Sequence, residues 1–195
     1  AGCSSDTICT SLGVGLSDLF TSTPKESKKV VATYTYQDEK GHELYQIVRY
    51  EPKGFTQRHK NSAGEYVNKM VGVRRVLYHL PEIIKADTVF LVEGEKDADN
   101  LIAWGRVATT SPGGAGAWKS EYAEYLKGKH VIIIPDNDEP GLNYARQVVS
   151  SLEGIATAHV ILLPTGIKDI SDWLAAGYDH KKLDNMLQAT TELDK

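Results

Sequence analysis

Two carboxylates stand one residue apart, directly behind an apolar run in the second half of the chain. The run is Val131–Ile134, Pro135 ends it, and the acids are Asp136 and Asp138. Consecutive β-branched residues indicate a strand buried on both faces, and ligands of open α/β sheets bind beyond the carboxyl ends of the strands. Carboxylate oxygens at that place suit Mg²⁺. Alternatively, Asp138 with Glu139-Pro140-Gly141 only forms a turn and caps the next helix.

A third carboxylate has an equivalent place after another apolar run. Residues 88–92 read as a buried strand, and Glu93-Gly94 follows it. From residue 87 onward strands alternate with helices, which predicts a mainly parallel sheet with right-handed crossovers. The crossovers bring Glu93, Asp136 and Asp138 to one edge of that sheet. Carboxylates gathered there repel one another unless a divalent cation lies among them.

The elements that would position these acids follow from the hydrophobic spacing. We expect strands at residues 88–92, 106–109, 129–135 and 156–163. We expect helices at residues 95–104, 118–126 and 181–188, and another that begins within residues 168–174 and ends at Gly177. The helix after Asp138 should bury Leu142, Ala145, Val149 and Leu152 as its inner stripe. The predicted fold class is α/β, with a mainly parallel sheet between layers of helices.

The region before residue 86 has a different pattern. Residues 30–49 alternate around Lys40-Gly41, which predicts a β-hairpin. Its tyrosines, Tyr34, Tyr36 and Tyr45, are interpreted as packing on a sheet face, with stacking on nucleic-acid bases as the alternative. We therefore expect a small β-rich subdomain at the N-terminal side of the parallel sheet.

Charge is unevenly distributed along the chain. Residues 25–85 contain 12 Lys and Arg against 7 Asp and Glu, whereas residues 86–195 contain 10 against 17. In residues 51–75 the cations are interleaved with Phe55 and Tyr66, a composition that would serve a nucleic-acid strand, since cations neutralise phosphates and rings stack on bases. A solvated β-hairpin explains the same pattern. The candidate binding cations are Lys53, Arg58, Arg74 and Arg75.

Composition sets the broad class of the protein. The chain of 195 residues is 41% hydrophobic and 25% charged, which is ordinary for a globular protein. No stretch predicts a membrane span or a signal peptide. The two cysteines, Cys3 and Cys9, cannot form a disulfide framework or a four-ligand zinc site, and free thiols fit a cytoplasmic setting.

The order of these motifs resembles the Toprim domain, which bacterial-type primases, topoisomerases, recombination mediators and some nucleases share. The residues that carry the resemblance are Glu93-Gly94-Glu95-Lys96-Asp97 after one strand and Asp136-Asn137-Asp138-Glu139-Pro140-Gly141 after another. Within Toprim proteins, the first motif and Arg75-Val76-Leu77-Tyr78-His79-Leu80 look like the primase branch. The resemblance implies the core of a DnaG-like DNA primase of phage or plasmid type.

The same resemblance implies a division of the chain. Residues 1–27 look like the tail of a zinc-binding module plus a linker, residues 28–85 a small basic subdomain, and residues 86–195 the Toprim domain with C-terminal helices. Cys3 would be the last zinc ligand of that module, whose other ligands are absent, so we predict no zinc in this chain. An ordinary free thiol is the alternative. The basic subdomain is smaller than in the chromosomal primase.

Roles for individual residues follow from the resemblance. Glu93 would be a metal ligand or the general base at the primer 3′-hydroxyl. Mg²⁺ or Mn²⁺ would be held by Asp97, Asp136, Asp138 and Asp169, while Asp172 could be a ligand or a helix cap. Lys96 would join the four cations named above in contacting template or nucleotide. The implied reaction is nucleotidyl transfer that makes short RNA primers, with single-stranded DNA and nucleoside triphosphates as partners and a replicative helicase as a further domain or partner.

Two rival functions remain open at this point. One is a Toprim nuclease that uses the same acids with water as nucleophile, which the primase-like stretch upstream of Glu93 argues against. The other is a module that binds nucleic acid and retains the fold without catalysis, which the small basic subdomain supports. Salt-sensitive DNA binding without any product would distinguish the second from an enzyme.

Overall fold

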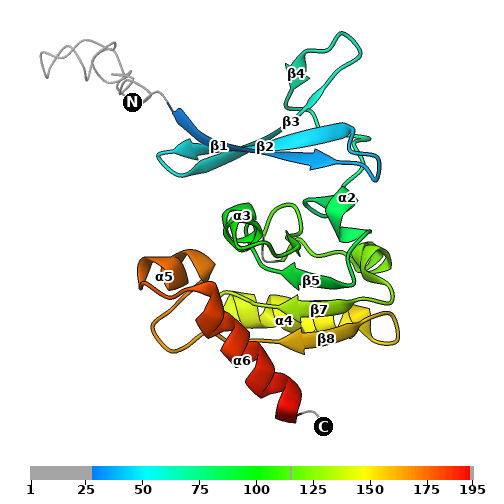
Figure 1. The fold of residues 1–195 in the computed structure, drawn as a ribbon. Coiled ribbons are helices and arrows are strands. Elements are labelled where there is room, and N and C mark those ends of the chain that lie inside the picture. Colours follow the sequence, from blue (N-terminus) through cyan, green and yellow to red (C-terminus); the bar gives the residue numbers. More distant parts are fainter. Residues whose placement is uncertain (1–27, 115, 194–195) are drawn as a thin grey trace, which may run out of the picture.

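The computed structural model describes residues 28–114 and 116–193, and within it the chain forms two four-stranded sheets. An antiparallel sheet comes first, and a parallel sheet with helices on both faces follows it (Figure 1). This arrangement confirms the predicted α/β fold class with its β-rich N-terminal part. In the described part of the chain, no helix is long and apolar enough to cross a membrane.

The antiparallel sheet is a meander of neighbouring strands. It contains β1 (Lys29–Gln37), β2 (Glu43–Glu51), β3 (Gly54–Lys60) and β4 (Tyr66–Val67). Asp38 closes the β1–β2 turn, because its carboxylate accepts hydrogen bonds from the backbone N–H groups of Lys40 and His42. The hairpin predicted around Lys40-Gly41 is thereby confirmed.

The parallel sheet has the strand order β6-β5-β7-β8. Its strands are β5 (Thr88–Leu91), β6 (Ala108–Thr109), β7 (His130–Ile133) and β8 (Thr157–Val160). Leu91 of β5 pairs with Ile133 of β7, so the two central strands end side by side. The register therefore brings the residues that follow them, Glu93 and Asp136, to the same edge.

Helices cover both faces of this sheet. They are α2 (Leu80–Ile83), α3 (Glu95–Ala103), η2 (Ser120–Leu126), α4 (Glu139–Leu152), α5 (Ile170–Ala175) and α6 (His180–Leu193). Alternate residues of β5 face opposite sides, as in any strand. Phe90 packs in one buried cluster with residues of α3, α5 and α6, while Val89 and Leu91 pack in another with residues of η2 and α4.

One local expectation was wrong, whereas the helix expected at residues 118–126 is present as a 3-10 helix at Ser120–Leu126. On α4 the buried stripe is Gly141, Tyr144, Ala145, Val148 and Leu152, whereas Leu142 and Val149 are only partly buried. Gly141 approaches the neighbouring strand end closely (described below), and Tyr144, one turn later, is buried with its hydroxyl 3.3 Å from that of Ser111. Leu142 and Val149 instead lie along a groove beside β8, the last strand of the sheet.

The two sheets share one hydrophobic cluster. Tyr36 and Tyr45 are fully buried, and their rings stack with centroids 4.6 Å apart. The Tyr36 hydroxyl donates a hydrogen bond of 2.8 Å to Glu95 at the start of α3, and burial raises the pKa of that carboxyl. Packing on a sheet face is therefore confirmed for these tyrosines, since a buried ring cannot stack on a base. The predicted division at residues 27 and 85 stays a prediction, and Cys3 lies outside the described residues.

Candidate metal and catalytic site

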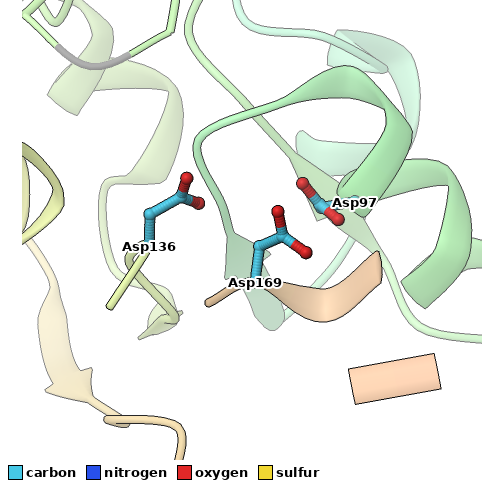
Figure 2. Close-up of side chains that lie close together, drawn as sticks. All are labelled: Asp97, Asp136 and Asp169. Atoms are coloured by element: carbon cyan, nitrogen blue, oxygen red, sulfur yellow. The ribbon is translucent and has the colours of Figure 1, made fainter. Parts of the chain in front are cut away.

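Three aspartates converge at the carboxyl edge of the parallel sheet. Asp97, Asp136 and Asp169 each offer a carboxylate oxygen, and these oxygens lie within 4.8 Å of one another. Figure 2 shows the three side chains pointing toward a common space from three different segments. Asp97 comes from α3, Asp136 follows β7, and Asp169 immediately precedes α5. The chain thus brings together acids that are far apart in sequence.

Hydrogen bonds to the start of α5 fix two of these aspartates. Asp97, which is 9% exposed, accepts hydrogen bonds at Oδ1 from the Ser171 N–H (2.9 Å) and hydroxyl (2.7 Å). Burial raises the pKa of Asp97, and the Ser171 hydrogen bonds oppose the rise. Asp169 is the N-cap of α5, because its Oδ1 accepts the Asp172 N–H at 2.8 Å. Helix α5 therefore supplies one ligand and holds another in place.

Glu93 lies beside Asp136 but outside the group of three. Its Oε1 accepts the Asp136 backbone N–H at 3.0 Å. Burial, and then repulsion from Asp136, raise the pKa of Glu93 to about 7. The pKa of Asp136 rises to about 6, also through burial, although Lys168 opposes the rise. Burial and mutual repulsion therefore oppose the simultaneous ionisation of these two acids, and a bound cation would favour it.

Gly141 allows α4 to approach this pair of acids closely. A Cβ atom built there would lie 2.3 Å from the Asp136 carbonyl oxygen and 2.3 Å from Glu93 Oε1. Both contacts are far inside van der Waals range, so no other residue fits without displacing the backbone. The sequence motif Asp136-Asn137-Asp138-Glu139-Pro140-Gly141 thus contains a packing requirement as well as acids.

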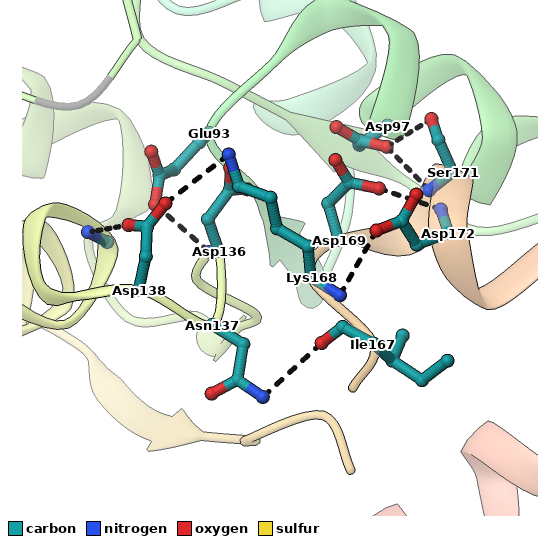
Figure 3. A network of polar contacts seen from close by, with 11 residues as sticks. Glu93, Asp97, Asp136, Asn137, Asp138, Ile167, Lys168, Asp169, Ser171 and Asp172 are labelled. Carbon is teal, nitrogen blue, oxygen red and sulfur yellow. Dashed lines mark hydrogen bonds and ion pairs between the residues drawn. The ribbon is translucent and has the colours of Figure 1, made fainter. Parts of the chain in front are cut away.

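Asp138 has other partners than the three converging aspartates. It caps α4, since its Oδ1 accepts the Gly141 N–H at 2.9 Å, and this hydrogen bond holds its pKa below the usual value. Its Oδ2 lies 3.3 Å from the Nζ of Lys168, which also lies 3.4 Å from Asp136 Oδ2 (Figure 3). The helix cap that the sequence offered for Asp138 is confirmed, while its role as a metal ligand stays a prediction.

Asn137 attaches the turn before α5 to this motif. Its side-chain Nδ2 donates to the carbonyl oxygens of Leu163 (3.1 Å) and Ile167 (3.3 Å), and its backbone N–H donates to the Lys168 carbonyl at 2.7 Å. The middle residue of the Asp-x-Asp motif therefore determines where Lys168 and Asp169 stand. Asp172, which remained open between ligand and cap, accepts the Lys168 N–H at 3.3 Å.

The donor set fits a hard divalent cation. Mg²⁺ binds oxygens at about 2.1 Å in an octahedron, so opposite ligand oxygens lie about 4.2 Å apart. Adjacent ligand oxygens of the same octahedron lie only about 3.0 Å apart, so the three aspartate oxygens, which lie within 4.8 Å of one another, would move closer together on binding one ion. Oxygen donors without histidine or cysteine favour Mg²⁺ or Mn²⁺ over zinc. Asp97, Asp136 and Asp169 could hold such an ion.

The predicted binding cations separate into groups. Lys53 and Lys96 line one cavity of about 460 Å³, together with Arg49, Tyr34 and Tyr50. Arg74 forms an ion pair with Glu39 and also donates to the Tyr125 hydroxyl at 2.9 Å. The two remaining cations have partners on the antiparallel sheet: Arg75 donates to Gln57 at 2.6 Å, and Arg58 donates to Gln46 and lies over the Tyr66 ring.

Several residues of the site were missed by the sequence reasoning. Lys168 and Ser171 lie on either side of Asp169, but spacing gives no sign of which acid each would contact. Thr110, whose hydroxyl donates to the Glu93 carbonyl at 2.7 Å, carries no motif at all. Only Gly141 had a usable signal, because a glycine inside the first turn of a helix is costly unless close contact requires it.

Comparison with known proteins finds its similarities mainly in the parallel-sheet half of the chain. Residues 88–174 match the Toprim-like family. DNA primase DnaG of Thermofilum pendens (strain DSM 2475 / Hrk 5) is 38% identical over 73 residues, which cover 37% of this chain and 17% of that protein. Gene 57 protein of Mycobacterium phage D29 is 35% identical over 77 residues, which cover 39% of this chain and 48% of that protein. The chain thus spans less than half of either relative.

Solved structures extend the likeness to the antiparallel sheet. The zinc-binding and RNA polymerase domains of Aquifex aeolicus primase match with a TM-score of 0.63 and 19% identity, over 81% of this chain and 40% of that one. The primase fragment of the bacteriophage T7 primase-helicase matches with a TM-score of 0.58 and 19% identity, over 78% and 61%. A DnaG primase catalytic domain bound to single-stranded DNA matches with 0.59 and 20%, over 80% and 52%. At these identities the likeness establishes a primase-core-like fold.

Proposed function

We propose that this chain contains the catalytic core of a DNA primase, because residues 88–174 match the Toprim-like family and 73 residues of the chain are 38% identical to a DNA primase DnaG. The reaction is metal-dependent nucleotidyl transfer that makes short RNA primers on single-stranded DNA. The convergence of Asp97, Asp136 and Asp169 beside Glu93 is the observation that carries the proposal. The phage relative and the T7 likeness support a phage- or plasmid-like replication protein.

The proposed metal ligands are Asp97, Asp136 and Asp169. A bound Mg²⁺ or Mn²⁺ would supply positive charge for the phosphates of the incoming nucleotide. Ser171 keeps one Asp97 oxygen occupied, so that the other oxygen of Asp97 is left for the ion. Asp138 is the least suited of the predicted ligands, because the α4 cap and Lys168 engage its two oxygens.

We assign Glu93 as the general base for the primer 3′-hydroxyl. It adjoins Asp136 yet lies outside the three-aspartate group, which leaves its carboxylate for a proton rather than for an ion. Its backbone carbonyl is held by Thr110, and the helix start at Gly141 packs against its side chain. These contacts restrict Glu93 to one position at the end of β5, as proton transfer to a defined base requires.

Template and nucleotide contacts are proposed for the basic residues of both sheets. Lys53 and Lys96 suit this role best, since they line one cavity with Arg49 and two tyrosines. Arg58, Arg74 and Arg75 already have polar partners within the protein and would need to exchange them. We retain the division at residues 27 and 85 as part of this proposal, with no zinc bound by the chain itself.

Primer synthesis tests the proposal directly. Labelled nucleotides, single-stranded DNA and Mg²⁺ or Mn²⁺ should give short RNA products with the wild type and none with Glu93→Gln or Asp136→Asn. Lys181→Met, which changes an exposed residue of α6, is the matched control and should keep full activity. Omitting nucleotides should leave the DNA intact.

Three outcomes would point elsewhere. DNA shortened in the absence of nucleotides would favour the nuclease. Salt-sensitive DNA binding with no product under either metal, even after an upstream zinc-binding module is added, would favour a binding module. Products that persist in both Glu93→Gln and Asp136→Asn would show that the site lies somewhere other than this edge of the sheet.

A further inference from the structure

Lys168 places a positive charge between the two acids of the Asp136-Asn137-Asp138 motif. Its Nζ lies 3.4 Å from Asp136 Oδ2 and 3.3 Å from Asp138 Oδ2, so one ammonium group bridges both carboxylates (Figure 3). Of the cations in residues 28–114 and 116–193, Lys168 is the one that forms an ion pair with either acid. A divalent ion shared by Asp136 and Asp138 would have to occupy this same region.

The backbone of Lys168 is anchored on both sides. Its carbonyl oxygen accepts the Asn137 N–H at 2.7 Å, and its own N–H donates to Asp172 Oδ2 at 3.3 Å. The Asn137 side chain also holds the preceding residue, through the Ile167 carbonyl. Although the Lys168 side chain is half exposed, it therefore extends from a fixed point directly opposite the two acids.

Both carboxylate oxygens of Asp138 already have partners within the protein. Oδ1 accepts the Gly141 N–H at the start of α4, and Oδ2 faces Lys168. By contrast, Asp136 turns toward Asp97 and Asp169, as Figure 2 shows. Asp136 is thus shared between two positions, one surrounded by aspartates and one filled by an ammonium group.

From this geometry we infer that the site takes a single divalent cation, held by Asp97, Asp136 and Asp169, and that Lys168 is the resident cation in the second position, between Asp136 and Asp138. The inference rests on the proposed function for the first ion. A second divalent ion would lie in contact range of the ammonium group and be repelled by it. Lys168 is in this sense a positioning residue, which neutralises Asp138 and leaves Asp136 for the single ion.

Counting bound ions tests the inference without reference to activity. We would titrate the full chain with Mn²⁺ and follow free Mn²⁺ by electron paramagnetic resonance, comparing wild type, Lys168→Met, Lys168→Arg and the control Lys181→Met. Wild type, Lys168→Arg and Lys181→Met should each bind one ion. Lys168→Met should bind two, and its first ion should bind about tenfold tighter because a nearby like charge has been removed.

A double variant identifies the place of the second ion. Adding Asp138→Asn to Lys168→Met should return the count to one, with circular dichroism to confirm that every variant is folded. Two ions in the wild type, none in the wild type, or one in Lys168→Met would overturn the inference. Primer synthesis on the same samples separates the two proposals: two ions in an active wild type count against this inference alone, and the expected counts without any primer count against the proposed function alone.

Discussion

The carboxyl edge of the parallel sheet and the antiparallel sheet carry opposite charges and are built in opposite ways. At the edge, acids from three segments converge on one another, and Lys168 forms ion pairs with two of the acids there, Asp136 and Asp138. In the basic part of the chain, Arg58 of β3 and Arg74, which lies between β4 and α2, are already paired with neighbouring polar groups. Topology brings Glu93 and Asp136 together, because neighbouring parallel strands end at one edge, while α3 and the start of α5 add Asp97 and Asp169. Nothing comparable gathers the cations, so their positions follow from local contacts.

The largest effect should come from filling the contact between α4 and the acids. Gly141→Ala should lower the free energy of unfolding by about 3 kcal/mol, because the new Cβ overlaps the Asp136 carbonyl and Glu93. Urea denaturation measures this. Ser150→Ala, at an exposed position of the same helix, is the control and should change stability by less than about 0.5 kcal/mol. Equal stability of both variants would mean that this helix start does not pack as described.

The second-largest effect should come from metal binding, which should stabilise the protein through the acidic edge of the parallel sheet and not through the antiparallel sheet. At an Mg²⁺ concentration 100 times the dissociation constant, the wild type should gain about 2.7 kcal/mol of stability. Asp136→Asn should gain almost nothing, since it removes a ligand from the group of three. Arg58→Gln on the antiparallel sheet should gain as much as the wild type. Thermal denaturation with and without Mg²⁺ gives the comparison, and a full gain in Asp136→Asn would exclude the proposed ligand set.

Acid titration should reveal the crowded carboxylates in the metal-free protein. The pKa of Glu93 is about 7 in the fold, above its ordinary value of 4.5. The folded state thus keeps a proton that the unfolded chain has released, so stability should fall as the pH rises from about 4.5 to 7 and stay low above that. Half-burial limits the loss to about 1–2 kcal/mol.

Glu93→Gln should reduce the fall above about pH 6, and leave the part that comes from the raised pKa of Asp136, which is about 6. Denaturant unfolding between pH 5 and pH 8 would show the difference, and Mg²⁺ should reduce the fall in the wild type. A stability that rises over the same pH range in the wild type would contradict the assignment of the raised pKa to Glu93.

The smallest effects should come from single cations. Lys96→Gln should weaken binding to single-stranded DNA about fivefold and lower the slope of log K against log salt by about one, as for one lost phosphate contact. Arg74→Gln should have less effect on binding, because Glu39 and Tyr125 already hold its guanidinium. Fluorescence anisotropy at several salt concentrations provides both numbers. A larger loss of DNA affinity for Arg74→Gln than for Lys96→Gln would indicate that the DNA binds near Arg74 and not at the cavity that Lys96 lines.

The sequence predicted the positions of residues that directly follow strands. It predicted less well which hydrogen-bond and ion-pair partners individual side chains have. Glu93 and Asp136 were expected at one edge because each ends a buried strand, and register depends only on that pattern. The separation of Asp138 from the other acids was not foreseen, since it depends on how Lys168 extends from a turn without periodicity. The inner face of α4 was predicted about one residue out of register, because hydrophobic spacing could not show the contact at Gly141.

The three ligands of the candidate ion come from α3, the end of β7 and the start of α5, and these segments lie far apart in the sequence. Such long-range contacts form late, because distant parts of the chain must first be brought together. During synthesis on the ribosome, the site cannot assemble until α5 has emerged and docked through Ser171 onto Asp97. Binding of an ion here would therefore require that α3, the end of β7 and α5 are assembled, and a chain truncated before α5 would be unable to bind it.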